Sequence, residues 1–261
     1  MISRRTIQIE QSVLEEVKMR ENRAVIALSG GADSATMLYL AIATCHEVHA
    51  ISVNYGQRHK KELECAKALC QELNIKHTII DFDLTQFGGS PLVDFSMGVP
   101  AQADMKQATT VVPYRNSFII LLAAAYAKAN NLNTIYIGAT YEDLANYEDC
   151  RPVFFDAFEN AARLGGTIHD LKIDTPFIDM TKERIIQLGH HRLSVPYEKT
   201  WTCYEGGDEP CMQCDACRER MEAFRLNGIY DPLISEDNWN AYIQNIEKNK
   251  YRKVEVKKNE R

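Results

Sequence analysis

The segment Ser29-Gly30-Gly31-Ala32-Asp33-Ser34 has the residue types of an anion-binding loop. It follows a short apolar run at 24–28 and precedes a segment with the apolar spacing of a helix. Two glycines allow a tight turn that brings N–H groups close to an anion, and the positive end of the following helix favours phosphate. Ser29 and Ser34 add hydroxyl donors, and Asp33 suits a Mg²⁺ ion that bridges a pyrophosphate. The alternative is a plain Gly-Gly turn followed by a helix cap.

The loop differs from two common nucleotide-binding loops. It contains no lysine, which excludes the Gly-x-x-x-x-Gly-Lys-Ser/Thr loop, and its glycines are adjacent rather than spaced as in dinucleotide-binding proteins. Its position after the first predicted strand favours a ligand site, because ligands of open parallel sheets bind beyond the carboxyl ends of the strands.

A second group of reactive side chains consists of four closely spaced cysteines: Cys203, Cys211, Cys214 and Cys217. Two Cys-x-x-Cys steps share Cys214, and Gly206-Gly207 lets the chain fold back to Cys203. Four thiolates fill a tetrahedral site completely, so the spacing predicts structural Zn²⁺ with no open position for water. A redox pair does not need four cysteines, and an iron–sulfur cluster is the remaining alternative.

The segments around these motifs alternate between strand and helix patterns. Apolar runs predict five strands, at 24–28, 48–53, 77–82, 134–137 and 169–173, with helices predicted at 34–45, 60–73, 117–129, 152–164 and 181–188. The strands are too apolar to have a solvent-exposed face. We therefore predict an α/β fold with a Rossmann-like parallel sheet covered by helices on both faces. Residues 83–113 have weak periodicity, which is typical of a lid or binding loop.

The charges are unevenly distributed along the 261 residues. The formal net charge is −6, but residues 248–261 hold seven Lys/Arg and two Glu, so the rest of the chain is near −11. An acidic body is a poor general binder of nucleic acid, because phosphate contacts need a basic surface. We expect no nucleic-acid partner and interpret the basic tail as solvated. The sequence shows neither an apolar run of membrane-spanning length nor a secretory signal, so we expect a cytoplasmic protein.

Together the motifs resemble the 7-cyano-7-deazaguanine synthase (QueC) family of the N-type ATP pyrophosphatases, from Arg23 to about Phe224. The stretches that carry the resemblance are 28–34, 54–63, 112–116, 147–154, 181–182 and 202–204. The resemblance implies that ATP, with Mg²⁺, adenylates the carboxylate of 7-carboxy-7-deazaguanine and that ammonia displaces AMP to give an amide. A second adenylation then allows dehydration to the nitrile 7-cyano-7-deazaguanine (preQ0), an intermediate of queuosine biosynthesis. It also implies a homodimer.

The resemblance divides the chain into four parts. These are an N-terminal helical extension at 1–22, an ATP pyrophosphatase domain at 23–194, a small zinc-binding helical segment at 195–228 and a polar, basic tail at 229–261.

The same resemblance, with the topology, implies roles for individual residues. The nucleotide would be held by Ser29, Gly30, Gly31, Ala32, Asp33, Ser34, Val53, Asn54 and Tyr55. The deazaguanine substrate would be held by Arg115, Asn116, Asp143, Tyr147, Asp149 and Arg151, with Asp143 or Asp149 reading the N–H edge of the base. The catalytic residues would be Asp33, Arg115 and Lys182. The alternatives are an ordinary ion pair for Arg115 and a solvated side chain for Lys182.

The sequence also leaves other functions open. Family members usually carry Asp at Asn54, Ser at Thr202 and Gly at Met212, and the chain extends beyond the resemblance at both ends. These departures suggest as the alternative a specialised relative, of a phage or an antiviral defence system, that stops at the amide or transfers the deazaguanine acyl group to a protein or another amine. Another ATP pyrophosphatase is a third hypothesis and a non-catalytic scaffold a fourth.

Overall fold

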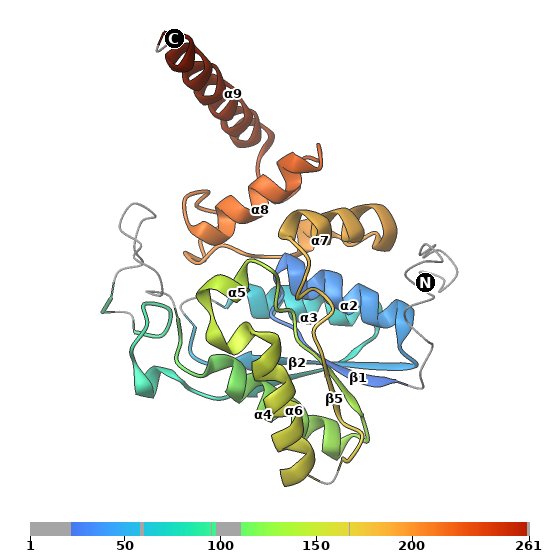
Figure 1. Ribbon diagram of the computed structural model, residues 1–261. Coiled ribbons are helices and arrows are strands. Elements are labelled where there is room, and N and C mark those ends of the chain that lie inside the picture. Colours follow the sequence, from blue (N-terminus) through green and yellow to red (C-terminus); the bar gives the residue numbers. More distant parts are fainter. Residues whose placement is uncertain (1–21, 58–59, 95, 98–110, 167, 260–261) are drawn as a thin grey trace.

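Five parallel strands form the central sheet of the protein, in the order β3-β2-β1-β4-β5 (Figure 1). The computed structural model describes residues 22–57, 60–94, 96–97, 111–166 and 168–259. The strands are β1 (Arg23–Ala27), β2 (Glu47–Asn54), β3 (Lys76–Asp81), β4 (Thr134–Tyr136) and β5 (Lys172–Asp174). The chain builds the sheet outward from β1 through β2 to β3, and then returns to the other side of β1 with β4 and β5. This reversal creates a topological switch point between β1 and β4, where ligands of such sheets bind.

Helices cover both faces of the sheet, as the apolar strands require (Figure 1). On one face lie α2 (Ala32–Thr44), α3 (Lys61–Leu73) and α7 (Lys182–Leu188), and on the other lie α4 (Arg115–Ala129) and α6 (Pro152–Gly165). The remaining helices are α5 (Asp143–Asn146), α8 (Asp215–Leu226) and α9 (Glu236–Asn259). Short 3-10 turns span Thr85–Phe87, Glu148–Cys150 and Tyr197–Lys199, and a π-helical turn spans Gly189–Leu193.

The alternation of side chains along β1 separates two parts of the core. Ala24 and Ile26 pack with α2, α3 and α7, whereas Val25 packs with α4 and α6. All three are fully buried. This period of two is the geometry of a strand that is covered on both faces, and it fixes which helix lies on which side.

The sequence predicted most elements to within a few residues. The fifth strand was placed too early: β5 begins at Lys172, because residues 169–171 form a turn in which Leu171 N donates to Ile168 O at 3.3 Å. The expected helical extension at 1–22 lies outside the described residues, except for Asn22.

The segment after residue 194 is joined to the sheet domain by a shared core. Val195, Tyr197, Met221 and Phe224 belong to the same buried cluster as α2 and α7. The cluster also contains Trp239 of α9, and the rest of that helix projects away from the body (Figure 1).

A buried ion pair fixes the connection between α8 and α9. Arg220 and Asp231 are 1% and 0% exposed, and Arg220 Nε and Nη2 donate to the Asp231 carboxylate at 2.8 and 2.9 Å. Arg220 also donates to Thr200 Oγ1 at 2.7 Å and to Tyr197 O at 3.0 Å. This saturation with partners is what makes a buried guanidinium tolerable.

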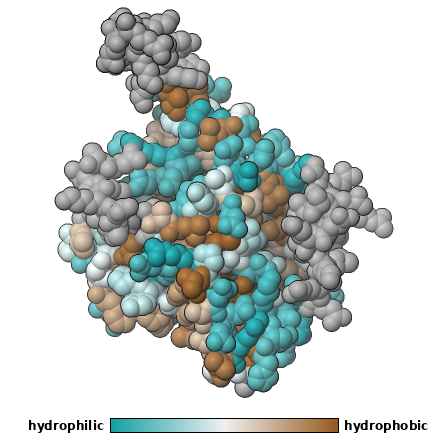
Figure 2. Space-filling model, viewed as in Figure 1, coloured by the Kyte–Doolittle hydropathy of each residue, from teal (hydrophilic) through white to brown (hydrophobic). Residues whose placement is uncertain are grey.

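The surface mixes polar and apolar residues. On the face seen in Figure 2, hydrophobic residues occur in small separate groups among hydrophilic ones. Within the described part of the chain, no helix combines the length and the apolar character needed to cross a membrane.

Candidate active site

The loop between β1 and α2 is folded by its own serines. Ser29 Oγ lies 2.9 Å from Ser34 Oγ, Gly31 N donates to Ser29 Oγ at 3.2 Å, and Gly30 N donates to Ser34 Oγ at 3.2 Å. Gly30 has φ +97°, a conformation that side chains other than glycine rarely adopt. The first amides of α2 have no intrahelical acceptor and carry the positive end of the helix dipole. The loop therefore has the construction of an anion site.

A cavity of about 670 Å³ opens beyond this loop, at the carboxyl ends of β1, β2 and β4. Most of the residues predicted to bind nucleotide or substrate line it: Ser29, Gly31, Ala32, Asp33, Ser34, Val53, Tyr55, Arg115, Asn116, Asp143, Tyr147 and Lys182. These residues, which are spread over positions 29–182 of the sequence, thus surround one cavity. Its volume is large enough for a nucleotide beside a heterocyclic acid.

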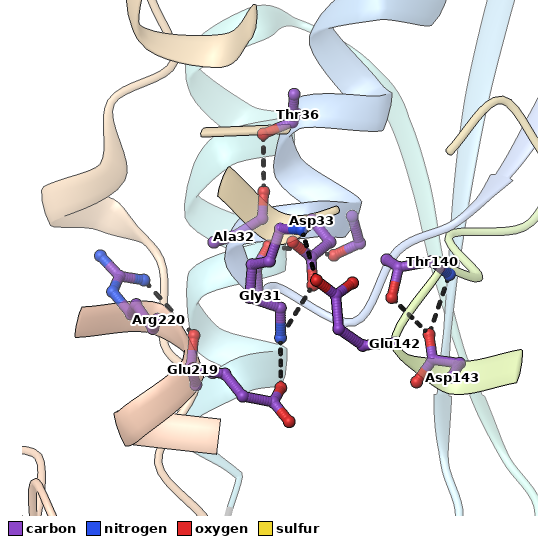
Figure 3. Close-up of polar contacts among 12 residues, drawn as sticks. Gly31, Ala32, Asp33, Thr36, Thr140, Glu142, Asp143, Glu219 and Arg220 are labelled. Carbon is purple, nitrogen blue, oxygen red and sulfur yellow. Dashed lines mark hydrogen bonds and ion pairs between the residues drawn. The ribbon is translucent and has the colours of Figure 1, made fainter. Parts of the chain in front are cut away.

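Lys182 contacts acidic side chains from three parts of the chain, namely Asp33, Glu142 and Glu219. Figure 3 shows these three carboxylates gathered beside the start of α2. Its Nζ lies 3.5 Å from Asp33 Oδ2 and donates to Glu219 Oε2 at 2.9 Å, and its backbone N donates to Glu142 Oε1 at 3.0 Å. Burial acts to lower the pKa of Lys182, but Asp33 and Glu219 raise it above its ordinary value. Lys182 is therefore a cation fixed in the cavity wall rather than a solvated lysine.

Three buried carboxylate oxygens in this cavity lack a hydrogen-bond partner: Asp33 Oδ1, Glu142 Oε2 and Asp215 Oδ1. Burial raises the pKa of Asp33, an effect that Lys182 partly offsets. An unpartnered buried carboxylate is costly unless a cation or donor completes it. Because Mg²⁺ prefers carboxylate and phosphate oxygens, Asp33 with Glu142 fits a site for this ion beside the loop.

Arg115 begins α4 and faces the cavity from the side opposite to the α2 face of the sheet. The preceding Tyr114 has φ 56°, so the backbone turns sharply just before the helix. Burial acts to lower the pKa of Arg115, but nearby Tyr55 and Tyr147 raise it, so the guanidinium stays charged. Tyr55, Tyr147 and Tyr204 also line the cavity and give it flat apolar walls next to this cation.

The acidic residues of 141–151 have different positions. Asp143 lines the cavity, and its Oδ2 accepts from Thr140 N and Thr140 Oγ1, both at 2.9 Å (Figure 3). Asp149 does not line it, because its Oδ2 accepts from Asn116 N at 3.3 Å and so serves the start of α4. Arg151 is also outside the lining and donates to Leu144 O at 3.5 Å. Asp149 and Arg151 thus lie outside the cavity lining, and a contact of either residue with substrate stays a prediction.

Two residues of the predicted nucleotide site also lie off the cavity surface. Gly30 supports the loop from behind, and Asn54 donates from Nδ2 to Asp81 Oδ1 of β3 at 2.7 Å. An aspartate at position 54, as the family usually has, would face the Asp81 carboxylate with like charge. The departure at Asn54 therefore concerns a contact between strands rather than the cavity.

The four clustered cysteines converge as predicted. Their Sγ atoms all lie within 4.8 Å of one another. A tetrahedral zinc site with Zn–S bonds of about 2.3 Å needs sulfur atoms roughly 3.8 Å apart, and Cys211 Sγ and Cys217 Sγ are separated by 4.0 Å. Backbone N–H groups of Glu205 and Cys211 donate to Cys203 Sγ at 3.4 and 3.3 Å. The donor set fits a metal ion held entirely by thiolates.

The cysteine segment is connected directly to the anion loop through Trp201, which is 2% exposed. Trp201 N donates to Gly30 O and Trp201 Nε1 donates to Cys203 O, both at 3.0 Å. Lys61 Nζ of α3 lies 3.8 Å from the centre of the Trp201 ring and donates to Gly207 O and Asp208 O at 2.8 Å.

Several lining residues have no predicted role: Glu62, Glu142, Thr202, Tyr204, Asp215 and Glu219. Glu62, Thr202 and Tyr204 lie within stretches that carry the family resemblance, and this resemblance was the signal that could have identified them. The α8 residues had none, because only tertiary packing brings the cysteine segment to the sheet edge.

Sheet, loop and cavity together define a nucleotide-binding α/β protein of the pyrophosphate-loop class. A model of the family "Queuosine biosynthesis protein QueC" matches residues 23–228. Since this match covers most of the chain, the chain belongs to the QueC family, and the family predicted from the motifs is confirmed.

Relatives extend the comparison. The chain is 43% identical to 7-cyano-7-deazaguanine synthase of Trichodesmium erythraeum, over 81% of this chain and 100% of the relative. It is 39% identical to 7-cyano-7-deazaguanine synthase of Archaeoglobus fulgidus, over 85% of this chain and 94% of the relative. Among solved structures it is similar to NMN synthetase from Francisella tularensis, with a TM-score of 0.47 and 18% identity over 88% of this chain and 84% of that one.

Proposed function

We propose that this chain is an ATP-dependent carbon–nitrogen ligase that converts 7-carboxy-7-deazaguanine and ammonia into 7-cyano-7-deazaguanine, with release of AMP and pyrophosphate. The observation that carries the proposal is the convergence of the Ser29–Ser34 loop, Asp33, Lys182 and Arg115 on one cavity, in a member of the QueC family. The relatives named 7-cyano-7-deazaguanine synthase support the choice of substrate and product.

In the proposed reaction the loop amides and the hydroxyls of Ser29 and Ser34 bind the departing pyrophosphate. Asp33, with Glu142, holds Mg²⁺, which neutralises phosphate charge when bound. Lys182 places a second positive charge at the same end of the cavity. Val53 and Tyr55, at the end of β2, meet the adenosine. The chain's main contribution is then to bring two anions together and to stabilise the leaving group.

The substrate half of the cavity lies around Arg115. Its guanidinium binds the carboxylate of 7-carboxy-7-deazaguanine in two-pronged fashion, with Asn116 beside it. Tyr55, Tyr147 and Tyr204 flank the flat bicyclic ring, and Asp143 accepts from its N–H edge.

The proposal includes a structural Zn²⁺ on Cys203, Cys211, Cys214 and Cys217, for which the convergence of four sulfurs is the support. We also propose that the chain divides into an ATP pyrophosphatase domain at 23–194, a zinc-binding segment at 195–228, and terminal parts at 1–22 and 229–261. A homodimer is proposed from the family resemblance alone. A cytoplasmic location is supported by the eight cysteines, none of which forms a disulfide.

The test is mass spectrometry of the products formed by the purified chain from 7-carboxy-7-deazaguanine, ATP-Mg²⁺ and ammonium. We expect the nitrile together with AMP. Asp33→Asn should lower AMP release by roughly 10²-fold or more, because it removes the metal-binding charge. The matched control is Asp156→Asn, an exposed change on α6, which should leave the rate unchanged.

The other outcomes discriminate between hypotheses. AMP with the amide as final product, or AMP only when a protein or other amine is supplied, would replace this proposal by the specialised relative. No AMP release by the wild-type chain would refute the ligase assignment.

A further inference from the structure

Glu62 lines the cavity but has no role in the reaction as described so far. It is the second residue of α3, and this helix begins directly against the anion loop. A Cβ atom placed on Gly30 would lie 2.0 Å from the carbonyl oxygen of Glu62, and one placed on Gly31 would lie 4.0 Å from Glu62 Oε1. The carboxyl group is therefore held beside the loop that would bind the nucleotide phosphates.

The other acidic residues of this cavity are largely engaged. Lys182 contacts Asp33, Glu142 and Glu219, and Thr140 donates two hydrogen bonds to Asp143. Glu62 instead lies within electrostatic reach of Arg115, beside which the substrate carboxylate is proposed to bind. Burial raises the pKa of the Glu62 carboxyl to about 7, although Arg115 acts to lower it. A carboxyl group that exchanges a proton near neutral pH is suited to general acid–base catalysis.

The proposed reaction needs such a group. Ammonia is present at neutral pH almost entirely as ammonium, which has no lone pair for attack on an acyl-adenylate. Because neutral ammonia is then only a minor species, a base within the cavity that takes a proton from the ammonium ion supplies the nucleophile where the carbon–nitrogen bond forms.

We propose that the Glu62 carboxylate binds the incoming ammonium ion and accepts a proton from it, delivering neutral ammonia to the acyl-adenylate. The nitrogen lone pair then forms the C–N bond as the C–O bond to AMP breaks, and AMP leaves with that electron pair. A second proton leaves the nitrogen for solvent as the neutral amide forms, and no redox change occurs. This inference rests on the proposed function and assigns to it one further catalytic residue.

The experiment compares Glu62→Gln with the wild-type chain and with Glu64→Gln, an exposed glutamate on the same helix. Three rates are measured: amide and nitrile formation with ammonium, hydroxamate formation with hydroxylamine, and ATP–pyrophosphate exchange with 7-carboxy-7-deazaguanine. Hydroxylamine is mostly unprotonated at neutral pH and does not need the base. ATP–pyrophosphate exchange reports adenylation alone, and a variant that retains this activity is folded.

We expect Glu62→Gln to lose roughly 10²-fold in kcat/KM for ammonium, with exchange and hydroxamate formation within a few-fold of wild type. Glu62→Asp, which keeps a carboxylate, should recover part of the loss, and Glu64→Gln should match wild type.

Two results would overturn the inference while leaving the proposed function intact. One is wild-type activity of Glu62→Gln with ammonium. The other is an equal loss with both nucleophiles and in exchange, which would mean that Glu62 only supports the loop. If the wild-type chain itself releases no AMP, the proposed function fails, and this inference fails with it.

Discussion

At the scale of single residues, burial gives ordinary side chains unusual properties. Lys182 keeps its charge in spite of burial because Asp33 and Glu219 lie next to it. Burial disfavours the ionised form of Glu62 and raises the pKa of its carboxyl group to about 7. Residue type alone gives the pKa of neither group, because burial by itself would favour the neutral amine of Lys182 and it favours the protonated form of Glu62.

The raised pKa of Glu62 predicts how stability depends on pH. The groups that act on it from neighbouring elements are Arg115 of α4, Tyr55 after β2 and Cys203 of the cysteine segment. Because the folded pKa lies above the ordinary value of 4.5, the stabilising effect is full below about pH 4.5 and is lost as pH rises through 7. The Glu62→Gln variant lacks this ionisable carboxyl group, so this contribution to the pH dependence of its stability is absent.

The measurement is denaturant unfolding of both chains between pH 5 and pH 8. The free energy of unfolding of the wild type, relative to Glu62→Gln, should fall by about 1–3 kcal/mol over this range. The same comparison with Glu64→Gln should show no such trend, because Glu64 is exposed. A constant difference for Glu62→Gln would contradict the raised pKa.

At the scale of elements, the site depends on how closely α3 approaches the loop between β1 and α2. Gly30 is the contact point, since its backbone has φ +97° and leaves no space for a side chain beside the carbonyl of Glu62. Met212 is a contrasting case, because it has a positive φ of 56° without being a glycine. Its side chain packs against the core, whereas a side chain on Gly30 would meet backbone.

Gly30→Ala should therefore destabilise the chain by about 1–3 kcal/mol and weaken ATP binding at least tenfold, since the loop must move to make room. Gly165→Ala, at the end of α6 with nothing within 4 Å, should change neither property measurably. Isothermal titration with ATP and thermal unfolding give the two readouts. Unchanged ATP affinity in Gly30→Ala would show that the close approach of α3 is dispensable.

At the scale of the whole molecule, the C-terminal segment completes the cavity. Thr202, Tyr204, Asp215 and Glu219 form part of its wall, and Trp201 ties the cysteine cluster to the carbonyl of Gly30. Arg220 and Asp231 extend this connection to the residues that precede α9. The molecule thus works as one unit, although its sequence has a clear change of pattern near residue 195.

Loss of the metal should consequently affect nucleotide binding as well as stability. Metal analysis of the purified chain should find about one zinc per molecule. Cys217→Ser should lose the metal, destabilise the chain by more than about 4 kcal/mol and weaken ATP binding, because the wall that α8 provides is released. Cys45→Ser removes a cysteine outside the cluster and should retain the metal. If Cys217→Ser bound ATP as tightly as the wild type, the predicted coupling between the metal site and the nucleotide cavity would be refuted.

The sequence by itself determined the local features of this protein. Apolar runs predicted the five strands, because strands covered on both faces are largely apolar, although the fifth strand was placed three residues too early and β3, at the sheet edge, has no fully buried residue. The residues of 29–34 predicted the anion loop, because its chemistry is contained in six neighbours. The four cysteines were predicted for the same reason, since their spacing alone limits how they can close around a metal.

Tertiary structure decided everything that depends on distant segments meeting. It brought Glu62, Glu142 and the α8 residues into the cavity, and it turned Asp149, Arg151 and Asn54 away from it, although all three stand beside predicted site residues in the sequence. The direction of a side chain and the burial of a charge arise from packing between elements. No window of neighbouring residues contains that information.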